Sequence, residues 1–429
     1  MNQYNLVMMH YSYPPVVGGV ENVVQKHAEL FSDRGYTVNI LTGRGESSRA
    51  NIKIEKFDLL DSANSRILEI KNELDEGEIP SAFYQAKTEL KTWLEPRLMK
   101  ADAIIAHNIC TLHKNLPLSA ALYEFMHNDY APPLVAWNHD FAWTNKQYLP
   151  QLYDEWPWDI LKQVWSPNHF HVTVSNDRKI QLSELLRIPP SEIFVIPSGI
   201  EYEKVLNLDP KTVEIINYFS LENAFPILLL PSRITRRKNI EFAIDVVNEL
   251  KTYYPSIVLI ITGPPGPHNP KNQSYFDELK ELTSRYELTP AKNDGKNGAR
   301  VIFLAEYTDA FLSLETIYSL FRISDALFFP SLQEGFGIPI LEAGITGIPI
   351  FCSNIGPFHE TAGDFANYFD LTESPSKVAA IIHKFFKGNE ISLLKKRIRQ
   401  KYTWGSIFSQ EIEPLVIKAI NHRKRLIND

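Results

Sequence analysis

Short, mostly apolar segments alternate with longer helix-forming segments along this chain, and this alternation constrains the fold most. Five short segments lie in the first half, at 6–9, 37–41, 103–106, 134–137 and 171–174. Five more lie in the second half, at 227–230, 257–261, 301–304, 326–329 and 348–351. Strands that alternate with helices are typical of parallel sheets covered by helices on both faces. The sequence therefore predicts an α/β protein with two Rossmann-like sheets of about five strands each.

The length of 429 residues suggests two domains of about 200 residues each, close to the size at which a single core stops growing. We expect the first domain to span residues 1–198 and the second to span residues 199–405. The last helix, about 406–429, is expected to return to the first domain. Such a chain would form two Rossmann-like domains.

Two glutamates, Glu334 and Glu342, mark a strand–loop–helix segment in the second half. The apolar run 325–330 indicates a buried strand, and Pro339 suits the first position of the next helix. This spacing puts Glu334 in the loop at the strand tip and Glu342 in the first turn of the helix. Because open α/β sheets bind ligands at the carboxyl ends of strands, one carboxylate could reach a sugar and the other a ribose. An ordinary turn with two solvated acids is the alternative.

The loop between these glutamates also offers backbone N–H groups to a phosphate. They belong to Gly335, Phe336 and Gly337. Helix N-termini accept anions because their first N–H groups have no partner within the helix. We therefore expect a diphosphate to lie against this loop.

Positive charge for the same site can come from a second strand–loop–helix segment. Its strand is 225–230, its loop is 231–238 and its amphipathic helix is 239–253. Arg233 and Lys238 could clamp a leaving diphosphate, because fixed cations stabilise charge that develops in a transition state. We expect Arg236 and Arg237 on the solvated side. An ordinary basic surface is the alternative for this loop.

With these segments in view, the chain resembles the retaining glycosyltransferases of family four. The resemblance implies the GT-B fold, which has two facing Rossmann-like domains with a cleft between them. The matching motifs follow the family's order over nearly the whole length. They are a glycine loop at 13–21 with Gly18 and Gly19, His139 within 137–143, a domain-crossing segment at 196–201, the residues Arg233, Lys238, Glu334 and Glu342, and Trp404 before the last helix.

The resemblance implies a hexosyltransferase that uses a nucleoside-diphosphate sugar, of the UDP-glucose or GDP-mannose type, and retains the anomeric configuration. The first domain would bind the hydroxyl acceptor, and the second would bind the donor. The resemblance implies that His139 and Glu334 are the catalytic residues. The implied donor-binding residues are Gly18, Gly19, Arg233, Lys238, Gly335, Phe336, Gly337 and Glu342.

Histidines at strand ends often serve only to complete a hydrogen-bond network, and this is the alternative for His139. Trp137, Phe141 and Trp143 could offer flat apolar faces to a pyranose ring, although alternation along a strand must send some of them into the core. His10 and His107 also follow predicted strands, and we expect neither to be essential.

One position departs from the family pattern. After strand 301–304 the family often has a glycine near the nucleobase, whereas this chain has Ala305 and Glu306. The choice between a uridine and a guanosine donor therefore stays open.

The chain contains no Asp-x-Asp pair, the carboxylate motif of metal-dependent sugar transferases. We expect no metal site and no bound cofactor, with the cations supplied by Arg233 and Lys238 instead.

Composition limits the partners of this chain. The formal net charge of -7 gives no support to nucleic-acid binding. No apolar stretch is long enough to span a membrane, and a core strand begins almost at the N-terminus, so we expect a cytoplasmic protein without a signal peptide. The basic helix-like segment 84–100 could contact a membrane surface, but Glu89 and Glu95 dilute its charge, which favours a solvated face.

Two other functions fit the same architecture. One is a nucleotide-sugar epimerase, which needs no acceptor, and the other is an inactive protein that only binds a sugar or nucleotide. The presence of both Glu334 and Glu342 argues against an inactive protein.

Overall fold

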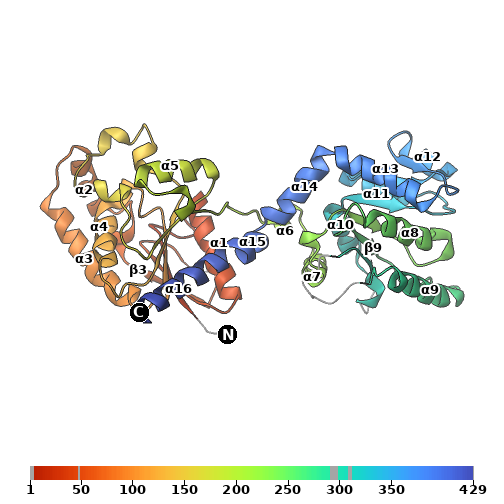
Figure 1. The fold of residues 1–429 in the computed structure, drawn as a ribbon, viewed down its shortest axis with the longest axis horizontal. Helices are drawn as coiled ribbons and strands as arrows, with labels where there is room; N and C mark the ends of the chain where they lie inside the picture. Colours follow the sequence, from red (N-terminus) through yellow and green to blue (C-terminus); the bar gives the residue numbers. More distant parts are fainter. Residues whose placement is uncertain (1–3, 47–48, 290–297, 308–311, 429) are drawn as a thin grey trace. The chain divides into compact units, whose positions relative to one another are not determined.

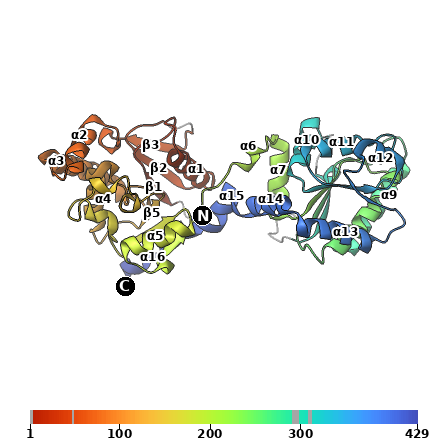
Figure 2. The same cartoon turned by 90° about the horizontal axis from the view of Figure 1, so that it is seen from above.

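The computed structural model describes residues 4–46, 49–289, 298–307 and 312–428 (Figures 1 and 2). The chain divides into two compact units, one made of residues 1–199 and 404–429 and the other of residues 200–403. Each unit is an α/β layer structure built on one parallel sheet, as the alternation of segments predicts. The family resemblance and this topology identify the fold as GT-B.

Over the described residues the first sheet has seven parallel strands in the order β3-β2-β1-β4-β5-β6-β7. The strands are β1 (Asn5–Met9), β2 (Thr37–Thr42), β3 (Ile52–Lys56), β4 (Ala103–His107), β5 (Leu134–Asn138), β6 (His169–Thr173) and β7 (Ile193–Val195). The order reverses between β1 and β4, and a doubly wound sheet binds its ligands at this switch point.

The second sheet, counted over the same residues, has six parallel strands in the order β10-β9-β8-β11-β12-β13. The strands are β8 (Ile227–Leu230), β9 (Val258–Ile261), β10 (Arg300–Phe303), β11 (Ala326–Phe329), β12 (Ile350–Ser353) and β13 (Asn367–Phe369). Its switch point lies between β8 and β11, the strands that precede the basic loop and the Glu334 loop.

The prediction of about five strands in each half is too low, because edge strands lack long apolar runs. β3 reads Ile-Lys-Ile-Glu-Lys, and only its first residue is buried. β7 and β13 are three residues long. A strand with one sheet neighbour needs less apolar surface, so these three strands leave a weak sequence signal.

Helices cover both faces of the first sheet. They are α1 (Gly19–Asp33), α2 (Ser65–Asp75), α3 (Ser81–Leu98), α4 (Leu116–Met126), α5 (Asn176–Leu186), α15 (Trp404–Ile407) and α16 (Glu413–Asn428). Side chains of β1 alternate between the faces: Val7 and Met9 pack with α2, α3 and α4, while Leu6 and Met8 pack with α1, α15 and α16. The ribbon in Figure 1 shows α2, α3 and α4 on the face of this sheet opposite to α1 and α16.

The second unit repeats this arrangement. Its helices are α6 (Tyr202–Val205), α7 (Pro210–Phe219), α8 (Ile240–Leu250), α9 (Lys271–Arg285), α10 (Leu314–Ile323), α11 (Ile338–Thr346), α12 (Gly356–Ala362), α13 (Pro375–Gly388) and α14 (Glu390–Lys401). Leu228 and Leu230 of β8 pack with α8, α9 and α13, whereas Ile227 and Leu229 pack with α7, α10, α11 and α12.

A buried ion pair fixes the strands that precede the two predicted loops. Asp325, directly before β11, accepts hydrogen bonds from the Ile227 backbone N–H of β8 and from the Arg399 guanidinium of α14, at 2.8 and 2.9 Å. Arg399 and Asp325 are 2% and 0% exposed. Removing either partner would leave a buried charge, at a cost of about 3–5 kcal/mol.

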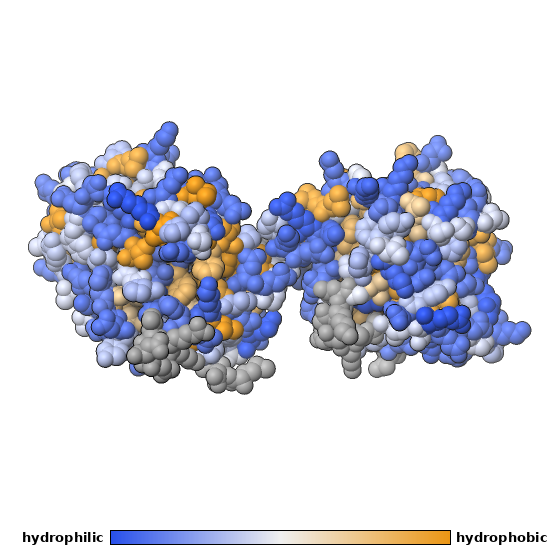
Figure 3. All heavy atoms as spheres, in the orientation of Figure 1, coloured by the Kyte–Doolittle hydropathy of each residue, from blue (hydrophilic) through white to orange (hydrophobic). Residues whose placement is uncertain are grey.

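Hydrophilic side chains cover most of the visible surface of each unit (Figure 3). Within the described residues, no helix is both long and apolar enough to cross a bilayer.

Candidate active site

The basic loop and the Glu334 loop lie side by side, because β8 and β11 are neighbours in the sheet. Parallel strands bring their following loops to the same edge. The Leu332 backbone N–H donates to the Arg237 carbonyl oxygen at 2.8 Å and joins the two loops directly. The two motifs, nearly one hundred residues apart in sequence, therefore form one site in the second unit.

Glu334 lies in the middle of this site. The Lys238 ammonium and the Ser331 hydroxyl both hydrogen-bond to its Oε1, the hydroxyl at 2.9 Å. Arg237 Nη1 donates to its Oε2 at 2.9 Å and to the Gln333 carbonyl oxygen at 3.2 Å. The side chains of Glu334 and Lys238 are each 9% exposed.

The charge of Glu334 follows from these contacts. Burial raises the pKa of its carboxyl, but the hydrogen bond and charge of Lys238, with the bonds from Ser331 and Arg237, more than offset this. The pKa of Glu334 therefore lies below its ordinary value, and the carboxylate is ionised at neutral pH.

The cations of the loop have different partners. Arg236 pairs with Glu278 at 2.7 Å on the surface, as a solvated residue should. Arg237 is also exposed, as expected, but its guanidinium contacts Glu334 as well. Arg233 is exposed, and its guanidinium pairs with no described residue. Its backbone packs closely against Gly263, because a Cβ atom on that glycine would lie 2.7 Å from the Arg233 Cα.

The Glu334 loop ends at a glycine that starts α11. Gly337 has φ +98°, a left-handed conformation that side chains resist, and an added Cβ would lie 3.0 Å from Phe358. Gly335 and Phe336 are exposed. No described side chain caps the N-terminus of α11. Pro339 has no N–H, and the Ile340 N–H donates to the Gly337 carbonyl oxygen at 2.9 Å. The Ile338 N–H at the start of the helix bonds to no described residue and is open to an anion.

Glu342 lies further into α11 than the first turn. The helix begins at Ile338, so Glu342 is its fifth residue. The side chain is half-buried, and no described residue pairs with its carboxylate. Burial raises the pKa of Glu342. The two glutamates therefore differ: Glu334 is ionised within a network, whereas Glu342 has free acceptor oxygens.

The position that departs from the family pattern lies at the end of β10. Ala305 and Glu306 belong to a short 3-10 turn, Leu304–Glu306, directly after that strand.

In the first unit, the glycine loop leads into α1. Gly18 is the residue before the helix and Gly19 is its first residue. A Cβ atom on Gly18 would lie 2.0 Å from Oε2 of Glu21, so the side chain of Glu21 occupies the space that Gly18 leaves. Glu21 accepts a hydrogen bond from Ser12 Oγ at 2.7 Å. The His10 ring, whose Nε2 lies 3.7 Å from Oε1 of Glu21, is the main cause that lowers the pKa of Glu21 to about 2, with the Ser12 hydrogen bond adding to it against the effect of burial.

His139 directly follows β5, at the switch point of the first sheet, where β1, β4 and β5 end. Its Nε2 atom lies 3.3 Å from Nδ1 of His107, the last residue of β4. Its backbone N–H donates to Asn108 Oδ1 at 2.8 Å. Asn108 has φ +60°, a conformation that asparagine tolerates. Burial, with the nearby charge of His10, lowers the pKa of His139 to about 4, so the ring is neutral at pH 7.

The histidine network was only partly foreseen. A hydrogen-bond network around His139 was the alternative reading, and the structure contains such a network. His10 and His107 were expected to be inessential, yet His107 contacts His139 and the His107 carbonyl oxygen accepts a bond from His10 Nδ1 at 3.0 Å. The sequence signal that could have revealed this network is that His10, His107 and His139 all lie at the ends of neighbouring parallel strands.

The aromatic residues around His139 are mostly core. Trp137 is 2% exposed and Phe141 is 1% exposed. Trp143 is partly buried and donates from Nε1 to the Trp158 carbonyl oxygen at 3.2 Å. Trp137 and Phe141 therefore present no open face to a pyranose ring.

The described residues contain no group of three histidine, cysteine, aspartate or glutamate side chains arranged to hold a metal ion.

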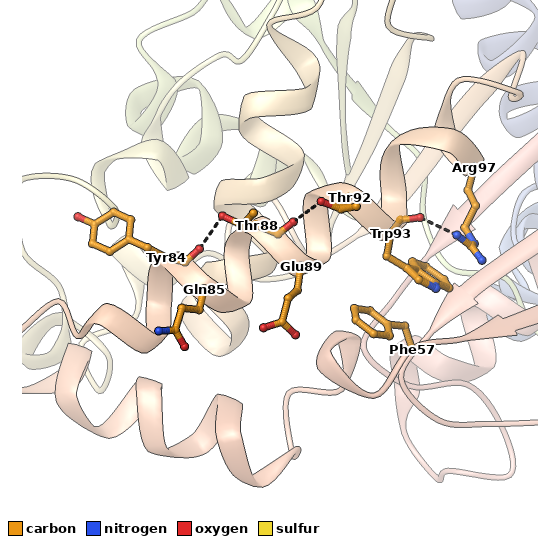
Figure 4. Close-up of a pocket in the computed structure, with 8 residues that line it drawn as sticks. All are labelled: Phe57, Tyr84, Gln85, Thr88, Glu89, Thr92, Trp93 and Arg97. Carbon is orange, nitrogen blue, oxygen red and sulfur yellow. Dashed lines mark hydrogen bonds between the residues drawn. The ribbon is translucent and has the colours of Figure 1, made fainter.

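A separate open groove of about 850 Å³ lies along α3 (Figure 4). Phe57 stacks on Trp93, and the Arg97 guanidinium lies 3.9 Å from the Trp93 ring centre. Glu89, on the same helix, takes two bonds from Arg66 of α2, at 2.9 and 3.1 Å. The aromatic faces and the carboxylate of this groove are thus occupied by neighbouring side chains.

The basic side chains of α3 are also paired. Lys87 and Lys91 both bond to Glu124 of α4, and Arg97 donates to Glu55 of β3 at 2.8 Å. These cations are balanced by carboxylates of the same unit.

Two protein-family models match this chain, one over most of each unit. Residues 17–204 match the family model described as Glycosyltransferase Family 4, and residues 214–404 match the model described as Glycosyl transferases group 1. Together the two models cover both candidate sites, from the glycine loop to Trp404.

Individual relatives match at low identity over most of their length. A mannosylglucosylglycerate synthase of Thermotoga maritima is 22% identical, over 92% of this chain and 89% of that protein. An alpha-1,3/1,6-mannosyltransferase of Kluyveromyces lactis is 24% identical, over 85% of this chain and 71% of that protein. The crystal structure of Anabaena HepE in complex with UDP and glucose is 17% identical, over 96% and 99% of the two chains, with a TM-score of 0.34.

Proposed function

Because this chain belongs to the glycosyltransferases of family four, we propose that it moves a hexose from a nucleoside-diphosphate sugar to an acceptor hydroxyl. We further propose that it retains the anomeric configuration and needs no metal ion. The second unit binds the donor and the first binds the acceptor.

One observation carries this proposal: the Glu334 loop and the basic loop form a single network in front of the uncapped N-terminus of α11. Lys238 has three N–H donors and bonds to Glu334, so it can also bind a phosphate oxygen. Arg233 is exposed and pairs with no described residue. With the Ile338 N–H at the start of α11, these side chains supply positive charge for a diphosphate without a cofactor.

The chemistry follows from these groups. The bond between sugar C1 and the phosphate oxygen breaks, and the acceptor oxygen bonds to C1 on the same face. The acceptor proton passes to the leaving phosphate oxygen. Lys238, Arg233 and the helix N-terminus stabilise the negative charge on the diphosphate. Glu334, nearer the sugar, faces the positive character that builds up on the ring.

Glu342 has a different part in donor binding. Its carboxylate is half-buried and pairs with no described residue, so it can accept hydrogen bonds from the two ribose hydroxyls. This contact is the same in the ground state and the transition state, so it contributes affinity rather than rate.

The names of the relatives indicate which donor to test first. One is a mannosyltransferase that forms alpha linkages, and another is a mannosylglucosylglycerate synthase. We propose a mannosyl donor ahead of a glucosyl donor, with an alpha-linked product.

A screen of nucleotide sugars by thermal shift, with EDTA present throughout, tests the donor and the metal together. A donor that raises the melting temperature is then incubated with candidate acceptors, and the product linkage is read by NMR. We expect an alpha product formed at full rate in EDTA. A beta product, or activity lost in EDTA and restored by Mn²⁺, would contradict the proposal.

A further inference from the structure

His107 holds one ring nitrogen of His139 and leaves the other open. The rings lie nearly parallel, 5.6 Å apart, with Nδ1 of His107 3.3 Å from Nε2 of His139. Nδ1 of His139 hydrogen-bonds to no described residue. The backbone on either side is also held, because Asn108 Oδ1 accepts bonds from the N–H groups of His139 and Asp140. His139 can therefore meet a substrate only through Nδ1.

One proton lies between Nδ1 of His107 and Nε2 of His139, and both rings are neutral. The ring that carries this proton determines whether Nδ1 of His139 is a hydrogen-bond donor or an acceptor. If His139 were the donor, His107 would carry its own proton on Nε2. That atom is buried and bonds to no described residue. Buried N–H groups without an acceptor are rare in folded proteins. If His107 is the donor, its Nε2 carries only a lone pair, and the proton of His139 lies on Nδ1.

We propose that His107 is a positioning residue that keeps His139 in the Nδ1–H tautomer, so that the active-site histidine presents a hydrogen-bond donor to a substrate oxygen. The identity of that oxygen, a hydroxyl of the transferred sugar or of the acceptor, rests on the proposed function. The tautomer itself does not, since it follows from groups within the first unit.

This tautomer determines the role of His139 in the reaction. A neutral ring with Nδ1–H cannot take the acceptor proton at that atom, and its other nitrogen is occupied by His107. His139 therefore orients an oxygen and does not act as a general base. This agrees with the leaving phosphate as the group that receives the acceptor proton.

Long-range ¹H–¹⁵N correlation spectra of ¹⁵N-histidine-labelled protein test the tautomer without any substrate. The His139 signals are assigned by their loss in His139→Gln. We expect Nδ1 in the protonated range and Nε2 in the unprotonated range at pH 7. The reverse pattern would overturn the proposal, even if the protein proved to be an active transferase.

Two substitutions of His107 separate positioning from packing. His107→Phe keeps a stacked ring but removes the donor, whereas the Nδ2–H of His107→Asn can replace Nδ1–H. We expect His107→Phe to lose the Nδ1–H pattern of His139 and about tenfold in kcat, and His107→Asn to keep the pattern and most of kcat. Equal loss in both variants, with the His139 pattern intact in both, would show that His107 only packs.

Discussion

Nη1 of Arg237 lies 2.9 Å from Oε2 of Glu334, the oxygen that Lys238 leaves free. Each oxygen of this carboxylate thus has its own cation. Arg237 also holds the loop through its carbonyl oxygen, which accepts from Leu332, and through the Gln333 carbonyl, to which it donates. Arg237 therefore fixes the loop that carries Glu334, although its own guanidinium is 53% exposed.

Replacing Arg237 with Ala should lower kcat, because Glu334 loses a charged hydrogen bond and its loop loses an anchor. We expect a fall of about tenfold or more, on the scale of 1.5–3 kcal/mol for a bond to a charged group. Arg236→Ala is the matched control, since its pair with Glu278 is exposed and worth little. Steady-state rates are measured at saturating donor. An equal fall in Arg237→Ala and Arg236→Ala would contradict a specific role of Arg237 in positioning Glu334.

The second prediction concerns Lys238 and Arg233, the two cations proposed to bind the diphosphate. Lys238→Ala and Arg233→Ala should each remove a contact to the diphosphate, worth roughly 2–4 kcal/mol in the transition state. Turnover should fall about 10²-fold or more. Only Lys238→Ala should also lower the melting temperature, because it leaves the carboxylate of Glu334 short of a partner, whereas Arg233 is exposed. Near-normal turnover in both variants would show that the clamp is misassigned.

Substitutions of the two glutamates should change different kinetic constants. Glu342→Gln weakens a contact that is equal in ground and transition states, so it should mainly raise the KM for the donor. Glu334→Gln removes charge near the reacting carbon, so it should lower kcat at saturating donor. Initial rates over a range of donor concentrations check both. Full kcat in Glu334→Gln together with abolished kcat in Glu342→Gln would reverse the assigned roles.

The contributions of Glu334 and Glu342 to the stability of the protein should depend on pH in opposite directions. The pKa of Glu334 is lowered in the folded protein, so its contribution is present above the ordinary glutamate pKa and is lost as pH falls through the folded value. Glu334→Gln should therefore cost about 1–3 kcal/mol near pH 7 and little in acid.

For Glu342 the folded pKa is raised, so ionising this carboxyl as pH rises costs stability. Glu342→Gln should be at least as stable as the wild type at pH 7, and the difference should vanish below the unfolded pKa. Denaturant titrations at several pH values measure both variants. A large loss of stability in Glu342→Gln at pH 7 would show that its carboxylate has a partner in the folded protein.

The sequence indicates much of the fold because buried strands leave long apolar runs. It also predicts that Lys238 and Glu334 share a site, since both follow strands of one parallel sheet. The edge strands β3, β7 and β13 could not be found in this way, because a strand with one neighbour needs few apolar residues.

Side-chain partners within the site were harder to foresee. Arg236 and Arg237 are equivalent in sequence, and only the 3-10 turn Arg236–Lys238 sends one to Glu278 and the other to Glu334. The position of Glu342 depended on where α11 begins, which the left-handed Gly337 sets. His107 was passed over because a strand-end histidine alone does not reveal that the next strand ends in another.

Release of nucleoside diphosphate, followed with and without acceptor, tests the central claim most directly. A hexosyltransferase should release it at a rate that depends on acceptor, with one glycosylated product for each diphosphate, and Lys238→Ala should slow both about 10²-fold or more. Release or epimerised sugar without acceptor would indicate the epimerase, and donor binding without any turnover would indicate a protein that only binds. Either result would contradict transfer as the function of this chain.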